Sequence, residues 1–138
     1  MVRILVMCIL IAISGCTKRY VDIRKEHFEK LTFQSSGNYQ KVYQRVSHMF
    51  RTCWHRQTAG AYGSKIVANL YDELGHGEVA KYGNPGFDSA PQIVLVDIRP
   101  KDKVVTLVDV YIGREFMKGR GKIIEEWANG STECQTNL

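Results

Sequence analysis

Two apolar segments on either side of a short polar turn constrain the fold most strongly. Residues 92–99 read QIVLVDIR, residues 104–112 read VVTLVDVYI, and Pro-Lys-Asp-Lys lies between them. Runs rich in Val, Ile and Leu around such a turn are typical of paired antiparallel strands. Alternate residues of a strand point to opposite faces. The more apolar alternate set of the second strand should therefore face the core: Val104, Thr106, Val108, Val110 and Ile112.

Two further strands are predicted upstream of this pair. Residues 64–74 read SKIVANLYDEL and residues 77–82 read GEVAKY, and Gly75-His76-Gly77 supplies the connection between them. The residues in both segments suit strands, and the glycines suit a tight connection. We therefore expect about four antiparallel strands.

Two helices are predicted on either side of the strands. Residues 38–57 carry apolar side chains at steps of three and four, which indicates one buried stripe. The stripe comprises Tyr39, Val42, Tyr43, Val46, Met49, Phe50, Cys53 and Trp54. Ser36 or Asn38 can cap this helix. Residues 122–128 predict the second helix, and the GRG sequence at 119–121 disfavours an earlier start.

The second predicted helix also has one apolar face, and Gly130 suits its end. Because each helix has a single apolar face, we expect both to pack on the same face of the sheet. The predicted fold class is α+β, as a single domain over residues 38–138.

Composition agrees with a folded domain and limits the classes of partner. Hydrophobic residues make up 44% of the 138 residues and charged residues 24%, and the net charge is +5. The basic residues are scattered, with no dense run and no basic stripe with stacking aromatics, so we do not expect a nucleic-acid partner. A mildly basic surface is typical of a solvent-exposed protein surface. Alternatively, it attracts anionic partners such as phospholipid head groups.

The first fifteen residues predict a signal peptide. Arg3 precedes the apolar run ILVMCILIAIS, which is too short to cross a bilayer as a helix. The four residues Ile13-Ser14-Gly15-Cys16, which overlap the end of this run, resemble the lipobox of bacterial lipoproteins. The resemblance implies cleavage before Cys16 and lipidation of its thiol, and the mature chain then has a net charge near +4. An uncleaved anchor or ordinary secretion are the alternatives.

The resemblance also implies a location. Thr17 follows the cysteine, where Asp resembles an inner-membrane retention signal in many Gram-negative bacteria. We therefore expect a lipid anchor in the outer membrane, on the side that faces the periplasm. Residues 16–37 are expected to form the lipidated cysteine and a loose tether, since this segment is charged and its apolar face is weak. The layout resembles that of small proteobacterial lipoproteins of no particular characterised family.

Two cysteines should remain in the mature domain, because the lipobox resemblance implies that Cys8 leaves with the leader and that Cys16 carries lipid. An even pair in an exported chain suggests a disulfide, here between Cys53 and Cys134. Two buried thiols, a redox site or a metal site are the alternatives.

No residue set matches a catalytic motif, and no CxxC or HExxH sequence suggests a metal site. Neither a cofactor nor a catalytic residue is predicted. Asp97 and Asp109 lie on the less apolar face of the paired strands, where Arg99 or Lys65 can pair with them across strands. A shared acidic site formed by the two carboxylates is the alternative. The loop at 83–91, with Asn84 and Phe87, is the best candidate for binding, although a plain connection is favoured.

These observations favour a non-enzymatic envelope protein that is held to a membrane through Cys16. Its expected partner is another envelope protein or an anionic envelope component. The alternative is a small periplasmic hydrolase, or an inhibitor of a cell-wall enzyme. A cleft with two nearby carboxylates would favour an enzyme, and a continuous apolar or basic patch would favour binding.

Overall fold

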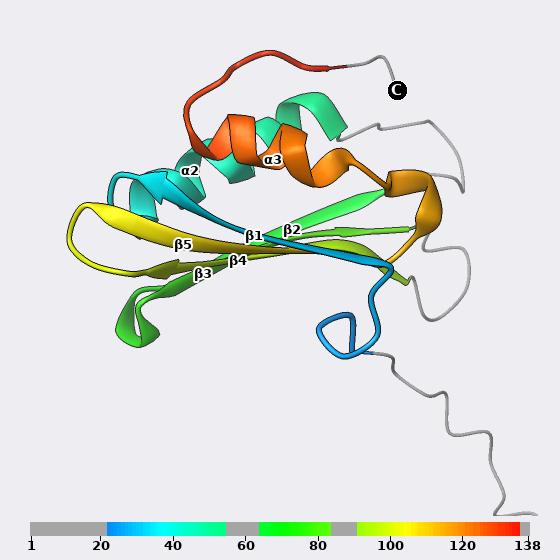
Figure 1. Ribbon diagram of the computed structural model, residues 1–138, viewed down its shortest axis with the longest axis horizontal. Coiled ribbons are helices and arrows are strands. Elements are labelled where there is room, and N and C mark those ends of the chain that lie inside the picture. The colour runs from blue at the N-terminus through cyan, green and yellow to red at the C-terminus, as the bar shows by residue number, and fades with distance from the viewer. Residues whose placement is uncertain (1–21, 55–63, 84–90, 136–138) are drawn as a thin grey trace, which may run out of the picture.

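In the part of the chain that the structure describes, a five-stranded antiparallel sheet forms one layer and two helices form the other (Figure 1). The computed structural model describes residues 22–54, 64–83 and 91–135. The strand order is β1-β5-β4-β3-β2. The main elements are β1 (Glu29–Ser36), α2 (Tyr39–Met49), β2 (Lys65–Tyr71), β3 (His76–Tyr82), β4 (Gln92–Pro100), β5 (Val105–Ile112) and α3 (Arg120–Ala128).

The predicted α+β class, the pairing of helices on one sheet face and the disulfide are confirmed, with five strands instead of four. The central strands β4 and β5 pair as expected, with Val96 opposite Val110. Thr106, Val108, Val110 and Ile112 are all buried, as their alternation predicts. Val104 is the exception at 68% exposed, because it lies in the turn before β5.

The fifth strand is β1, and it replaces the loose tether predicted over residues 16–37 with a strand at residues 29–36. Residues 29–36 pair along their whole length with β5, with Phe33 opposite Val108. Phe33 and Ser35 are buried toward the helices, whereas Lys30, Thr32 and Gln34 are exposed. An edge strand with few inward apolar residues has a weak alternation signal, which explains the error.

The first helix is shorter than predicted but buries the predicted stripe. The Asn38 side chain caps α2 by accepting a hydrogen bond from the Lys41 backbone N–H at 2.9 Å. A short π-helical segment, Phe50–Trp54, follows α2 directly. Residues 55–57 of the predicted helix lie outside the described residues. The stripe packs against the sheet through Val42, Val46, Met49, Phe50 and Trp54, with Tyr39, Tyr43 and Cys53 partly buried beside them.

The second helix begins at Arg120, two residues earlier than the glycines suggested. Gly119 has a φ of +78°, which glycine adopts without strain, and it precedes the first turn. Gly121 lies against β1, since a Cβ there would approach Leu31 Cδ2 to 3.1 Å. The two glycines thus shape the start of α3 and its close packing, where the sequence pattern suggested a break.

Aromatic packing and a disulfide join the two helical segments. The Trp54 ring lies 4.8 Å from Trp127 and 4.7 Å from Phe50, between centroids. The indole N–H of Trp127 donates to the Glu133 carbonyl at 2.9 Å, so this buried donor is satisfied. The predicted Cys53–Cys134 disulfide is present, with the Cα atoms 5.3 Å apart. It holds the segment after α3 against the π-helical end of the first helix.

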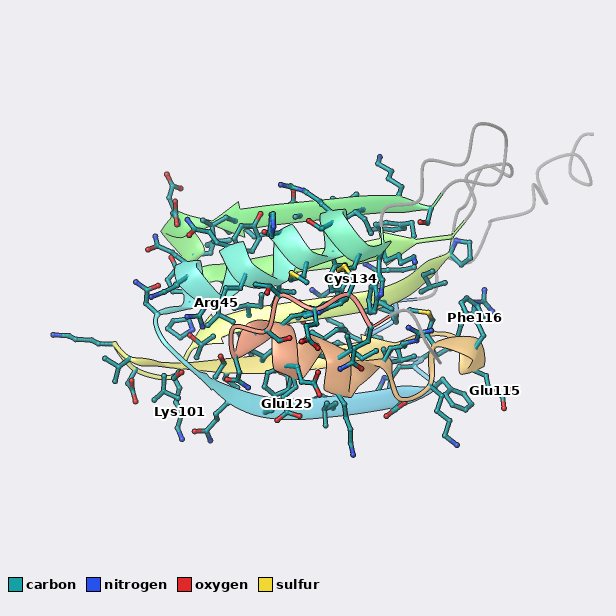
Figure 2. The ribbon with its side chains drawn as sticks, turned by 90° about the horizontal axis from the view of Figure 1, so that it is seen from above. Arg45, Lys101, Glu115, Phe116, Glu125 and Cys134 are labelled. Carbon is teal, nitrogen blue, oxygen red and sulfur yellow. A yellow bond between two sulfur atoms is a disulfide. The ribbon has the colours of Figure 1, made fainter. Side chains whose placement is uncertain are left out.

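The two ends of the sheet differ in what they carry. The N-terminal end, where β1 begins and β5 ends, carries residues 22–28 and 113–122 (Figure 1). The hairpin end carries the β2–β3 connection at 72–75 and the β4–β5 turn at 101–104. Viewed from above, Glu115 and Phe116 lie at one end of the molecule and Lys101 at the other (Figure 2). Strands of eight residues at about 3.4 Å each separate the two ends by about 27 Å.

Candidate functional site

Three carboxylates form a row across the sheet face that the helices leave open. The register puts Glu78 opposite Asp97, and Asp97 opposite Asp109. Their neighbours in each strand point into the helix-covered core, so these three side chains point the other way. Carboxylates placed directly opposite one another repel, and the row therefore requires cations close by.

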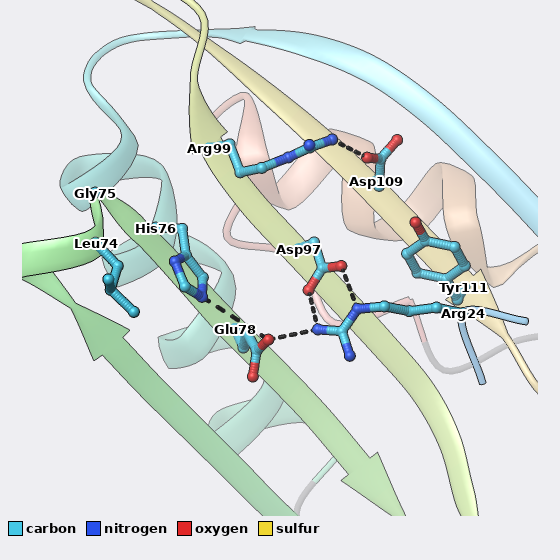
Figure 3. A pocket seen from close by; sticks show the side chains of 9 residues that line it. All are labelled: Arg24, Leu74, Gly75, His76, Glu78, Asp97, Arg99, Asp109 and Tyr111. Carbon is cyan, nitrogen blue, oxygen red and sulfur yellow. Dashed lines mark hydrogen bonds and ion pairs between the residues drawn. The ribbon is translucent and has the colours of Figure 1, made fainter. Parts of the chain in front are cut away.

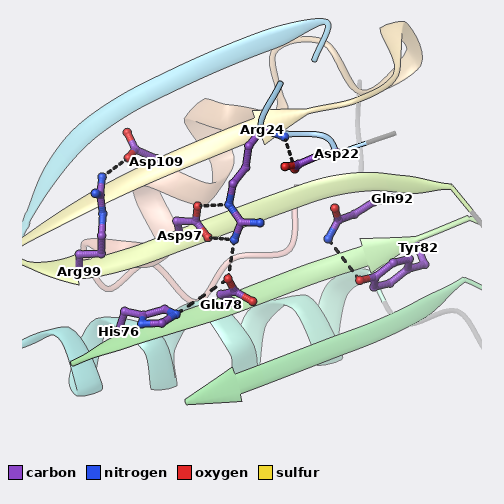
Figure 4. A network of polar contacts seen from close by, with 9 residues as sticks. All are labelled: Asp22, Arg24, His76, Glu78, Tyr82, Gln92, Asp97, Arg99 and Asp109. Atoms are coloured by element: carbon purple, nitrogen blue, oxygen red, sulfur yellow. Dashed lines mark hydrogen bonds and ion pairs between the residues drawn. The ribbon is translucent and has the colours of Figure 1, made fainter. Parts of the chain in front are cut away.

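Arg24 supplies one of these cations from the segment before β1 (Figure 4). Its Nε and Nη2 each donate to an oxygen of Asp97 at 2.8 Å, and Nη2 also donates to Glu78. Such a forked pair is the strongest contact that an arginine makes with a carboxylate. The hydrogen bond to Asp97 is the main factor that raises the pKa of Arg24 above its usual value. Residues 22–28 are thereby held across the open face.

Asp109 lies deeper in the same face and has its own partners. It is 5% exposed, which is costly for a carboxylate without compensating contacts. The Thr32 hydroxyl donates to it at 2.6 Å, and the Arg99 guanidinium donates to its other oxygen. The Lys30 ammonium lies 3.8 Å away. Each carboxylate of the row is therefore matched with cationic groups.

His76 extends the row toward the hairpin end. Its Nε2 lies 3.9 Å from the Glu78 carboxylate, and its ring stacks on Tyr71 at 4.7 Å between centroids. This histidine attracts Glu78 only when its ring carries a positive charge.

An apolar cluster lies beside the charged row on the same face. Ile23 is 2% exposed and packs with Ala80, Leu95 and Tyr111. Gly113 makes this packing possible, because a Cβ there would approach Ile23 Cδ1 to 2.9 Å and the Gln92 carbonyl to 2.8 Å. The residues around Arg24 are thus held by buried apolar contacts as well as by ion pairs.

A hollow of about 440 Å³ opens over the row (Figure 3). It lies among Arg24, Leu74, Gly75, His76, Glu78, Asp97, Arg99, Asp109 and Tyr111. These residues come from β3, β4, β5, the β2–β3 hairpin and the segment before β1. The hollow thus offers cations, carboxylates, an aromatic ring and the exposed Leu74 side chain to a ligand.

The structure confirms part of the sequence interpretation of this face. Asp97 and Asp109 are direct cross-strand neighbours, and Arg99 pairs with Asp109. Lys65 pairs in register with Tyr82 at the far end of β2, away from both carboxylates. Sequence reasoning missed Glu78, although the alternation of GEVAKY places it on this face. It also missed Arg24, because nothing periodic in residues 22–28 indicates where they dock.

The other predicted site residues lie outside the described part of the chain. These are Cys16, the proposed site of lipidation, and Asn84 and Phe87 of the predicted binding loop. The ends of that loop meet through a 2.8 Å hydrogen bond from the Gly83 N–H to the Pro91 carbonyl.

Within the described residues, no group of three or more His, Cys, Asp or Glu side chains is placed to hold a metal ion. Across the same residues, no helix has the length and apolar character needed to span a membrane.

Comparison with known proteins adds little to this description. No family model matches the chain, and no curated protein matches it. Among solved structures, the X-ray structure of norcoclaurine synthase from Thalictrum flavum is similar over 84% of this chain and 94% of that chain. The two share 9% sequence identity with a TM-score of 0.32, and a likeness at this level supports no conclusion about fold family or activity.

Proposed function

We propose that this chain is a lipid-anchored protein of the bacterial cell envelope that binds a partner through the open face of its sheet. The observation that carries the binding proposal is the difference between the two faces of the sheet. One face is covered by α2 and α3, whereas the other holds a hollow lined by ion-pairing side chains. Concave sites with a few converging polar groups are where proteins usually bind ligands.

The anchor is supported by the lipobox resemblance at residues 13–16. In the source bacterium, the mature protein should begin at an acylated Cys16, and Cys16→Ser should block both acylation and processing. Mass spectrometry of the N-terminal peptide measures both properties. An unmodified mature N-terminus at any other residue would contradict the anchor.

The chemistry of the hollow suggests the kind of partner. Arg24 spans Glu78 and Asp97, and Arg99 pairs with Asp109, so charges of both signs are present and matched. A partner would have to exchange these ion pairs for its own, which favours a polar segment of another envelope protein over an uncharged ligand. Leu74 is 72% exposed at the rim and adds an apolar contact.

Photo-cross-linking in intact cells tests this binding face. A photoreactive amino acid replaces Leu74 in one strain and Val104 in another. Val104 is 68% exposed at the same end of the sheet but does not line the hollow. We expect a discrete adduct from position 74 alone, and Glu78→Gln should weaken it by removing one charge from the hollow. Equal adducts at both positions, or none at either, would refute binding through the hollow.

A hydrolase is the second candidate, because Asp97 and Asp109 lie side by side under the hollow. Two carboxylates beside a cleft are the catalytic groups that glycoside hydrolases usually employ. Both oxygens of Asp97 are occupied by Arg24, however, and Asp109 is nearly buried. Neither carboxylate is free to contact a substrate or its attacking water until these contacts break, which is why we favour binding.

Release of fragments from purified cell wall distinguishes the two functions. The comparison is between the unmodified protein, Asp97→Asn and the control Glu73→Gln, which changes an exposed carboxylate outside the row. We expect no release by any of the three proteins. Release that Asp97→Asn abolishes and Glu73→Gln preserves would establish the enzyme and overturn the binding proposal.

A further inference from the structure

The chain between the proposed lipid anchor and the folded domain is short. Five residues separate Cys16 from Asp22, the first residue of the described domain. Even when fully extended, the six residue-to-residue steps from Cys16 to Asp22 span at most about 22 Å. Ile23 and Arg24 are then fixed to the sheet by burial and by ion pairs. If Cys16 is acylated, as proposed above, the domain is therefore held close to the bilayer surface.

The N-terminal end of the sheet is the part nearest to Ile23, close to the start of the described chain. Ile23 packs against the backbone of Gly113, just after β5, and the Phe28 N–H donates to the Ile112 carbonyl at 2.7 Å. The segment at 113–122 and the start of the described chain at residues 22–28 therefore lie at the same end of the sheet (Figure 1). The hairpin end lies about 27 Å farther along the strands.

The chemistry of this end matches a membrane surface. Phe116 is 71% exposed and Phe28 is 48% exposed, although phenylalanine is among the residues most often fully buried. Residues 113–122 contain four basic side chains and one acidic side chain, a formal charge of +3. Among the basic residues, Arg114, Lys118 and Lys122 are exposed. Residues 22–28 contain two basic and two acidic side chains and leave this charge unchanged.

The hairpin end has an exposed apolar residue but not the matching charge. Leu74 is 72% exposed, yet it directly follows Asp72 and Glu73. The two connections at this end, residues 72–75 and 101–104, contain three acidic and two basic side chains, a formal charge of −1. Anionic lipid attracts clustered Lys and Arg and repels carboxylates. The charge difference thus distinguishes the two ends as membrane surfaces.

We propose that the N-terminal end rests on the phospholipid leaflet that holds the anchor. Phe116 enters the boundary between head groups and acyl chains, and Arg114, Lys118 and Lys122 contact anionic head groups. An apolar insertion combined with basic residues is the usual arrangement of a peripheral membrane contact. The hollow on the open face and the hairpin end then extend away from the lipid, where a partner can reach them.

Tryptophan quenching in proteoliposomes tests this orientation. The acylated full-length mature protein is reconstituted into vesicles of phosphatidylcholine and phosphatidylglycerol that contain lipids brominated near the head group. Phe116→Trp places a fluorophore at the N-terminal end, and Leu74→Trp is the matched control at an equally exposed position. The native Trp54 and Trp127 are buried, and their emission is subtracted by means of the parent protein.

We expect the added tryptophan at position 116 to lose most of its emission, and the one at position 74 to keep most of its emission. Lys118→Glu combined with Lys122→Glu should restore most of the emission at position 116, as should high salt, which screens charge. Circular dichroism checks that the variants remain folded. Equal quenching at both positions, or at neither, in protein shown to be acylated would overturn the orientation while leaving the anchor intact.

Mass spectrometry of the same sample separates the two proposals. If no acyl chain is found, the anchor fails, and the same variants are mixed with preformed vesicles and sedimented. Binding that requires phosphatidylglycerol, quenches position 116 alone and disappears on charge reversal would uphold the membrane surface without the anchor. Absence of such binding would overturn the proposed membrane contact of the N-terminal end.

Discussion

Loss of the Cys53–Cys134 disulfide should cost a large share of the stability of this domain. The bond joins residues 81 positions apart and encloses β2, β3, β4, β5 and α3. For a loop of this length, the chain-entropy model assigns a stabilisation of about 4.5 kcal/mol. A domain of this size has a free energy of unfolding of about 5–15 kcal/mol. The perturbation is therefore large enough to measure precisely.

The folded state should survive the substitution with little other damage. The segment after α3 keeps the hydrogen bond from Trp127 to Glu133 and the one from Gln135 to Glu126. Cys134 is exposed, so a serine there leaves no large cavity. We therefore expect Cys53→Ser and Cys134→Ser each to lower the free energy of unfolding by about 2–5 kcal/mol. The double variant should lose no more than either single variant, because one bond is lost in each case.

Urea unfolding, followed by the fluorescence of Trp54 and Trp127, measures these changes. Trp54 lies within the π-helical segment and Trp127 packs against it, and both indoles are buried, so their fluorescence should report its unfolding. Thiol counting on the unfolded, unreduced protein checks the bond directly and should find no thiol from Cys53 or Cys134. A midpoint unchanged by either substitution, or additive losses in the double variant, would refute the reasoning.

Two further predictions concern packing. Phe50→Ala should lower the free energy of unfolding by about 3–5 kcal/mol, because it removes a fully buried ring and leaves a cavity, whereas Gln44→Ala on the exposed side of α2 should change it little. Equal urea midpoints for these two variants would contradict the packing of the helix. Gly113→Ala should increase hydrogen exchange at the Phe28 amide, which donates to the adjacent Ile112 carbonyl, because the new methyl group meets a backbone carbonyl and the Ile23 side chain at less than 3 Å. Unchanged protection of the Phe28 amide would show that the segment before β1 is not held as described.

The sequence alone predicted the elements whose side chains repeat with a clear period. Alternation in residues 104–112 identified the buried face of β5, and steps of three and four over residues 38–54 identified the stripe of the first helix. These predictions succeeded because a long segment with one buried face must repeat its apolar side chains with the period of its backbone. The disulfide was predicted because two cysteines, Cys53 and Cys134, remain once the predicted signal peptide and its lipidation site are set aside.

β1 and the start of α3 were decided by tertiary contacts. Residues 29–36 carry few inward apolar side chains, and pairing with β5 makes them a strand. Gly121 weakens a helix considered by itself, but here it allows α3 to lie close to Leu31. Local propensity differs by less than about 1 kcal/mol between most residues, so such contacts readily outweigh it.

On the charged face, too, the sequence pattern predicted one part of the arrangement and tertiary contacts determined the rest. Alternation alone placed Asp97 and Asp109 on the outer face, and their strand pairing made them neighbours. The contact of Arg24 with Asp97 joins residues 73 positions apart, and no local period encodes such a distance. Only the folded sheet brings the segment before β1 across the open face, because Ile23 is buried there once β3, β4 and β5 are assembled.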